Sequence, residues 1–222
     1  MQPNLALVKL LQLASPALPV GAYSYSQGLE TAIESAIVQD EASALTWIED
    51  VLSLSVATME APIFLRLCEA WGEDDLEAVQ RWNALFLASR ESAELRAETV
   101  QMGYSLAALV GNLGETHPFD TWPEVSFPAA FTYIAIRWHI DAQAALVAYL
   151  WSWAENQVLA AVKTVPLGQA AGQRVLAALG PALVQAAAHA SRIADDEMSN
   201  MAPGLAVQSS LHETQYSRLF RS

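Results

Sequence analysis

Cysteine and positive charge are both scarce in this 222-residue chain. Cys68 is the only cysteine, so no disulfide can form within the chain. Lysine and arginine number 11 against 24 aspartates and glutamates, which gives a formal net charge of −13. This balance argues against a nucleic-acid partner, because binding to a phosphate backbone needs basic surface. A negative surface instead favours the approach of a basic protein.

Long apolar runs and a basic leader are also missing. The uncharged apolar stretches 99–114 and 175–191 are shorter than the roughly 20 apolar residues that a membrane span requires. The first four residues, Met1-Gln2-Pro3-Asn4, contain no basic residue of the kind that begins a signal peptide. We therefore expect no membrane segment and a cytoplasmic location.

Helical periodicity is present from end to end, and no strict alternation of apolar and polar residues extends beyond a few positions. Asp40 is placed to cap a helix, and the apolar positions within 95–109 recur at spacings of three and four. The segment 141–165 is apolar nearly all round, which is typical of a helix surrounded by others. We predict an all-α fold, a single bundle of about ten helices spanning residues 1–200. Residues 201–222 are predicted to form a flexible connection and a tail.

No constellation of catalytic or metal-binding residues stands out. Cys68 lies in an apolar helical segment, where a buried, inert thiol is more common than a reactive one. The loop 21–28 begins and ends with glycine but lacks the Gly-Lys-Ser/Thr ending that cradles a phosphate. The histidines are scattered, with no H-x-x-x-H or C-x-x-C spacing: His117, His139, His189 and His212. We therefore predict no catalytic residue, no metal ligand set and no cofactor.

Two local features have more than one interpretation. Residues 22–30 hold Tyr23, Tyr25 and several other polar residues, which a serine-capped helix start or a recognition surface would each explain. Lys163 is a lone lysine in an apolar helix. It can extend to solvent, interact with the helix C-terminus, or provide a fixed positive charge at an interface.

The last fourteen residues are unusually rich in groups that bind other proteins. Tyr216, Leu219 and Phe220 stand at i, i+3 and i+4, so a short helix would gather them on one face beside Arg218 and Arg221. Tyrosine and arginine carry much of the binding energy at protein interfaces. Two interpretations are open: the tail folds onto its own core, or it binds a partner.

Three separated segments resemble one family. Residues 10–30, LLQLASPALPVGAYSYSQGLE, are similar to the N-terminal signature of the urease accessory protein family UreF. Residues 161–169, AVKTVPLGQ, resemble its late-helix motif, and residues 212–222, HETQYSRLFRS, resemble its C-terminal tail. The stretch 90–96, RESAELR, is a looser match. The matches are in order and span nearly the whole chain.

The resemblance implies an all-α homodimer with no catalytic activity of its own. Members of this family bind UreD, also called UreH, and the complex recruits the GTPase UreG. The assembly docks on apo-urease and couples GTP hydrolysis to nickel delivery. By position, the resemblance assigns the tail residues that bind UreD/UreH as Tyr216, Arg218, Leu219 and Phe220. It assigns the candidates that face UreG as Tyr23, Glu30 and Lys163. Residues 111–128 match no family pattern.

Two other functions stay open at this point. One is a helical enzyme or ligand-binding protein with an aromatic pocket lined by Tyr23, Tyr25, Trp151 and Trp153. The other is a GTPase-activating protein that accelerates hydrolysis by UreG. If the resemblance holds, residues 211–222 are expected to be mobile or loosely docked in the isolated protein.

Overall fold

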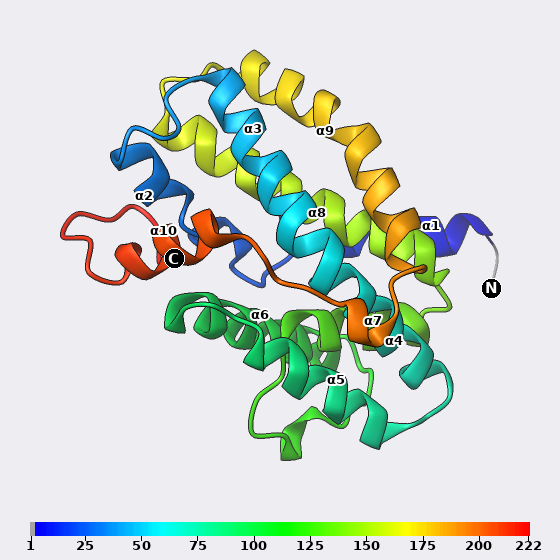
Figure 1. Cartoon of the computed structure of the whole chain (residues 1–222). Helices are drawn as coiled ribbons and strands as arrows, with labels where there is room; N and C mark the ends of the chain where they lie inside the picture. Colours follow the sequence, from blue (N-terminus) through cyan, green and yellow to red (C-terminus); the bar gives the residue numbers. More distant parts are fainter. Residues whose placement is uncertain (1–2) are drawn as a thin grey trace.

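The fold is known from a computed structural model that describes residues 3–222. Met1 and Gln2, where we looked for a signal peptide, lie outside the described residues. No strand occurs in residues 3–222, so the prediction of an all-α fold is confirmed. The α-helices in Figure 1 are α1 (Pro3–Leu13), α2 (Leu29–Glu34), α3 (Glu41–Val51), α4 (Ala61–Gly72), α5 (Leu76–Ala88), α6 (Ala93–Asn112), α7 (Phe127–Arg137), α8 (Ala142–Thr164), α9 (Gln169–Ala190) and α10 (Pro203–His212).

Helix α8 lies at the centre of the fold, as its all-round apolar sequence predicts. Asp141 begins it, with a side chain that accepts a hydrogen bond from the backbone N–H of Ala144 at 2.9 Å. The helix packs against α9 along much of its length, and against α1, α2, α3, α4 and α7. Leu146 and Leu150 on α8 are fully buried, which places the core of the molecule around this helix.

The long blue-green helix in Figure 1 joins the two halves of the bundle. Asp40 caps α3 through a reciprocal capping box with Ser43, which confirms the predicted helix start. A π-helical segment, η2 (Leu52–Glu60), connects α3 to α4 without a break. The continuous helix Glu41–Gly72 is long and apolar enough to resemble a membrane span, but 72% of its most apolar window is buried inside the protein. Such burial is typical of a core helix.

Helices α4, α5, α6 and α7 form one half of the bundle, and the segment 111–128 closes it. Gly103 on α6 allows this closure, because a Cβ there would lie 2.1 Å from the carbonyl oxygen of Val125. Phe119 and Trp122 pack on the indole of Trp71 with ring centroids 5.8 and 6.1 Å away. The segment for which the sequence predicted no role therefore covers the core.

Helix α10 occupies residues 203–212, within the segment that the sequence predicted to be a flexible connection. Its buried positions are spaced as one helical face, but most of them are polar: Leu205, Gln208, Ser209 and His212. A hydropathy pattern cannot reveal such a face. Gly28 allows the close packing of α2 on α10, since a Cβ on Gly28 would lie 2.8 Å from the backbone nitrogen of Ser209.

Candidate functional site

The tail folds back onto the N-terminal part of the chain. The backbone N–H of Arg221 donates to the carbonyl of Ser24 at 2.8 Å. The carbonyl oxygen of Ser222 accepts hydrogen bonds from the backbone N–H groups of Ser26 and Gln27, at 2.6 and 3.1 Å. The structure thus shows a docked tail in which backbone groups of the last residues are paired, and the expected mobility of 211–222 stays a prediction.

The tail residues do not form the helix that their spacing predicted. Residues 213–222 follow α10 as turns and bends. Phe220 is buried with 6% of its surface exposed, whereas Tyr216 is fully exposed and Leu219 is 64% exposed. The three side chains therefore do not share a face. Phe220 points into the chain's own core, and the other two remain open to solvent.

Glu30 anchors the tail to α2. Its two carboxylate oxygens accept hydrogen bonds from the backbone N–H groups of Leu219 and Phe220, at 2.7 and 2.9 Å. Glu30 occupies the first turn of α2, where the helix dipole favours a negative charge. One carboxylate therefore satisfies two backbone donors of the tail.

A buried histidine extends this anchor. His212, with no exposed side-chain surface, lies between Glu94 at 2.6 Å from Nδ1 and Glu30 at 3.3 Å from Nε2. Arg218 also pairs with Glu94, at 2.7 Å. Neither His212 nor Glu94 was predicted from the sequence to hold the tail. The only available signal was the histidine at the start of the 212–222 motif, whose partners lie far away in the chain.

Lys163 connects the remaining candidates. Its Nζ lies 5.8 Å from the centroid of the Tyr23 ring and 5.4 Å from that of Phe220. These distances allow cation–π attraction to both rings. Tyr23 and Lys163 are exposed. Lys163 therefore extends to the surface, where it lies against both an N-terminal residue and a tail residue.

The two predicted sets of site residues thus meet at one surface. Glu30 binds the tail backbone, and Lys163 lies close to Tyr23 and Phe220. Sequence reasoning placed these residues on two separate surfaces. We call the joint surface, made of Tyr23, Glu30, Lys163 and residues 216–222, the tail dock.

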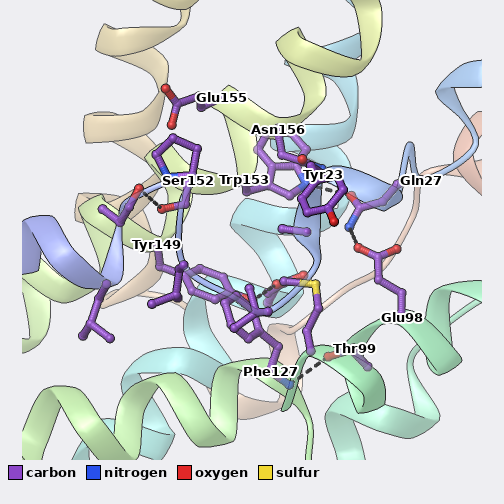
Figure 2. Close-up of a pocket in the computed structure, with 18 of the residues that line it drawn as sticks. Tyr23, Gln27, Glu98, Thr99, Phe127, Tyr149, Ser152, Trp153, Glu155 and Asn156 are labelled. Atoms are coloured by element: carbon purple, nitrogen blue, oxygen red, sulfur yellow. Dashed lines mark hydrogen bonds between the residues drawn. The ribbon is translucent and has the colours of Figure 1, made fainter. Parts of the chain in front are cut away.

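A cavity of about 100 Å³ lies behind the tail dock, between the loop 13–23, α6 and α8. Tyr23 and Trp153 line it, as the alternative prediction of an aromatic pocket proposed. Tyr25 is instead buried in the core, and Trp151 is exposed on α8 away from the lining. Figure 2 shows Glu98 beside the cavity, with its carboxylate directed at Gln27.

Glu98 belongs to a buried polar network that reaches the tail. Gln27 Nε2 and Ser222 Oγ each donate to one of its carboxylate oxygens at 2.8 Å. Gln27 in turn accepts a hydrogen bond from Trp153 Nε1 at 2.8 Å. Burial raises the pKa of Glu98 to about 7. The hydrogen bonds from Gln27 and Ser222 lower this pKa, but burial has the larger effect.

A second polar group forms the inner wall of the cavity. Glu60 accepts a hydrogen bond from the hydroxyl of Tyr149 and pairs with Arg90 at 3.3 Å. Burial, followed by the nearby charge of Glu60, raises the pKa of Tyr149 well above its ordinary value. Tyr149 therefore stays a neutral donor at physiological pH.

The chain is similar in sequence to known proteins of one family. The family model described as UreF matches residues 38–180. The chain is 53% identical to a urease accessory protein UreF from Dechloromonas aromatica (strain RCB), with all of both chains covered. It is 57% identical to a urease accessory protein UreF from Azoarcus sp. (strain BH72), covering 98% of this chain and 96% of that protein. The chain belongs to the UreF family.

Membership in the UreF family confirms the resemblance seen at the two ends of the chain. The family model covers the central helices, whereas the residues of the tail dock, apart from Lys163, lie before residue 38 or after residue 180. The full-length relatives include both outer parts. The assignment of individual dock residues to particular partners stays a prediction.

Neither the Cys68 thiol nor the His212 imidazole has the surroundings of a reactive centre. Cys68 is buried, and burial raises its pKa to about 12, so the sulfur stays a thiol. Each ring nitrogen of His212 already faces a carboxylate oxygen, so neither is free to coordinate a metal. In residues 3–222 no group of three or more potential ligands is arranged to hold a metal ion.

Proposed function

We propose that this chain is a non-catalytic scaffold in urease maturation. It binds UreD/UreH, recruits the GTPase UreG, and supports GTP-dependent insertion of nickel into apo-urease in the cytoplasm. Membership in the family of urease accessory proteins supports the general role. The partners and the site residues are our proposals, carried over from the sequence motifs.

The observation that carries the proposal is the tail dock. In this proposal Tyr216, Arg218, Leu219 and Phe220 engage UreD/UreH, and Tyr23, Glu30 and Lys163 face UreG. Glu30 binds the backbone of the tail, and Lys163 lies against Phe220. A partner that moves the tail therefore changes the surroundings of Glu30 and Lys163. Binding at one surface is thus coupled energetically to binding at the other.

We also propose that the scaffold works as a homodimer. Helix α1 supports this, because several of its leucine and valine side chains are exposed: Leu5, Leu7, Val8 and Leu11. Exposed apolar side chains gathered on one short helix mark an interaction surface. A second copy of the chain would cover them.

Substitution of Lys163 by alanine tests the UreG-facing role. Lys163→Ala removes a positive charge that lies beside Tyr23 and Phe220. We expect about tenfold weaker capture of UreG by the complex with UreD/UreH, equivalent to about 1.4 kcal/mol, and less nickel-dependent urease activation. The measurements are co-purification with UreG and urease activity after maturation.

The matched control is Arg81→Ala, which removes a positive charge on α5 from its place over the Trp82 ring. It should leave UreG capture unchanged. Unchanged capture and activation with Lys163→Ala would exclude the role. The rate of GTP hydrolysis by UreG, measured without this chain and with a saturating concentration of it, separates docking from GTPase activation. A docking scaffold leaves the rate unchanged.

A further inference from the structure

The cavity behind the tail dock has walls suited to a cation. Five aromatic residues line its volume of about 100 Å³, and Figure 2 labels four of them around it: Tyr23, Phe127, Tyr149 and Trp153, with Phe86 as the fifth. The negative faces of aromatic rings attract organic cations, and several rings around one space form the usual cage for an ammonium group.

The charges that line the cavity also favour a cation. Three carboxylates reach it, from Glu60, Glu98 and Glu155, against one guanidinium, from Arg90. Arg90 pairs with Glu60 at 3.3 Å. Glu98 is left with neutral hydrogen-bond donors only, Gln27 and Ser222.

Glu98 has unused capacity to bind a ligand. A carboxylate offers about four acceptor positions, and the two donors to Glu98 occupy one on each oxygen. The residue is 5% exposed, so bulk water does not stabilise its charge. Its pKa of about 7 reflects this burial. A cation inside the cavity would favour the ionised carboxylate and donate to the open positions.

We propose that this cavity binds a small organic ammonium ion, held by the ionised carboxylate of Glu98 and by the surrounding aromatic rings. The apolar part of the ligand would contact side chains such as Leu18, Met102 and Leu159, which also line the space. An anion is disfavoured by the excess of carboxylates, and among the described residues no three potential ligands are arranged to hold a metal ion. The proposal does not rest on the proposed role in urease maturation.

An occupied cavity would affect the tail. Glu98 accepts a hydrogen bond from Ser222 Oγ, and a bond to an ionised carboxylate is about twice as strong as one to a neutral group. A cation that keeps Glu98 ionised therefore strengthens the attachment of the last residue. The ligand and the docked tail stabilise each other.

Calorimetric titration of the full chain tests the proposal. The probes are n-butylammonium chloride and, as an anion of the same length, sodium butyrate, at matched ionic strength. Because binding needs ionised Glu98, whose pKa is about 7, we expect saturable butylammonium binding that is about tenfold tighter at pH 8 than at pH 6. At pH 7 binding should release protons, seen as heats that depend on the ionisation enthalpy of the buffer. Butyrate should not bind.

The variant pair assigns the site. Glu98→Gln keeps the shape of the side chain and should weaken butylammonium binding at least tenfold at pH 8. Glu69→Gln removes an exposed carboxylate on α4 and should bind as the wild type does. Circular dichroism checks that both variants are folded. If Glu98→Gln fails to fold, the wild-type pH dependence and proton release decide the question. The proposal would be overturned if butylammonium showed no saturable binding at pH 8, or if its binding did not depend on pH. It would also be overturned if butyrate bound equally well, or if folded Glu98→Gln kept full binding. The cavity would then be a water-filled one.

Discussion

At the level of single residues, Glu30 makes the most connections in the tail dock. Its carboxylate contacts the backbone of Leu219 and Phe220 and the imidazole of His212. A carboxylate can accept at both oxygens, whereas an amide has one acceptor oxygen. The negative charge at the start of α2 therefore decides whether both tail N–H groups are paired.

Substitution of Glu30 by glutamine should loosen the tail. Glu30→Gln leaves one of the N–H groups of Leu219 and Phe220 without its acceptor, which costs about 1 kcal/mol because the first bond is exposed and the second partly buried. We expect faster hydrogen exchange at these two amides, and faster trypsin cleavage after Arg218, while the helical content is unchanged. Hydrogen exchange with mass spectrometry, together with timed proteolysis, measures the effect.

Glu34→Gln, on an exposed position of the same helix, is the matched control and should leave both rates unchanged. Equal exchange and cleavage in wild type and Glu30→Gln would show that Glu30 does not hold the tail. The result would then favour an anchor made only by Phe220 and the paired carbonyl of Ser222.

At the level of elements, the π-helical segment η2 is hydrogen-bonded to the irregular segment 199–201. The backbone N–H groups of Ser199 and Met201 donate to the carbonyls of Thr58 and Leu54, each at 3.1 Å. Asn200 accepts from Ser55 Oγ at 2.5 Å and donates to the carbonyl of Ser89 at 2.7 Å. A π-helix is an unusual conformation, and these bonds satisfy groups that its geometry leaves available.

Removal of the Asn200 side chain should destabilise this junction. Asn200→Ala breaks both hydrogen bonds and leaves partly buried polar groups unpaired, with an expected loss of about 1–3 kcal/mol in the free energy of unfolding. Urea unfolding followed by circular dichroism measures this loss. Ser53→Ala, at an exposed position of η2, is the control and should change stability by less than about 0.5 kcal/mol. A similarly small change for Asn200→Ala would contradict the stabilising role of the segment 199–201.

The elements differ in how well the sequence predicts them. The sequence predicts three helices from local signals: α3 from a capping aspartate, α6 from an apolar stripe, and α8 from a long apolar segment. Helix α10 and the tail lack such signals. Gln208 accepts a hydrogen bond from the hydroxyl of Ser35, and His212 lies between Glu94 and Glu30. A single sequence does not reveal such distant partners of buried polar residues.

At the level of the whole molecule, the sequence does not predict which residues of the tail dock contact each other. Tyr23, Glu30 and Lys163 were predicted from motifs, and so was the tail, but not their contact with each other. Lys163 and Phe220 are 57 positions apart and meet only because α8 and the folded-back tail pass the same place. Glu98 was missed because it lies next to an apolar stripe on α6 and resembles an ordinary solvated glutamate in the sequence.

The docked tail separates residues that hold the fold from residues that are free for a partner. Phe220 is buried, so Phe220→Ala should lower the free energy of unfolding by about 3–5 kcal/mol, at the scale of a buried aromatic truncation. Tyr216 is fully exposed, so Tyr216→Ala should change stability by less than about 0.5 kcal/mol. If the tail binds UreD/UreH as proposed, Tyr216→Ala should nevertheless weaken capture of that partner about tenfold.

Urea unfolding and co-purification with UreD/UreH test this separation on the same two variants. A chain ending at His212 should lose capture and keep its helical signal, because helices α1 to α9 do not depend on residues 213–222 for their backbone hydrogen bonds. Full capture by both Tyr216→Ala and the shortened chain would place the UreD/UreH surface elsewhere. Strong destabilisation by Tyr216→Ala would instead mean that the exposed ring packs on the chain's own core, and that the tail only completes the fold.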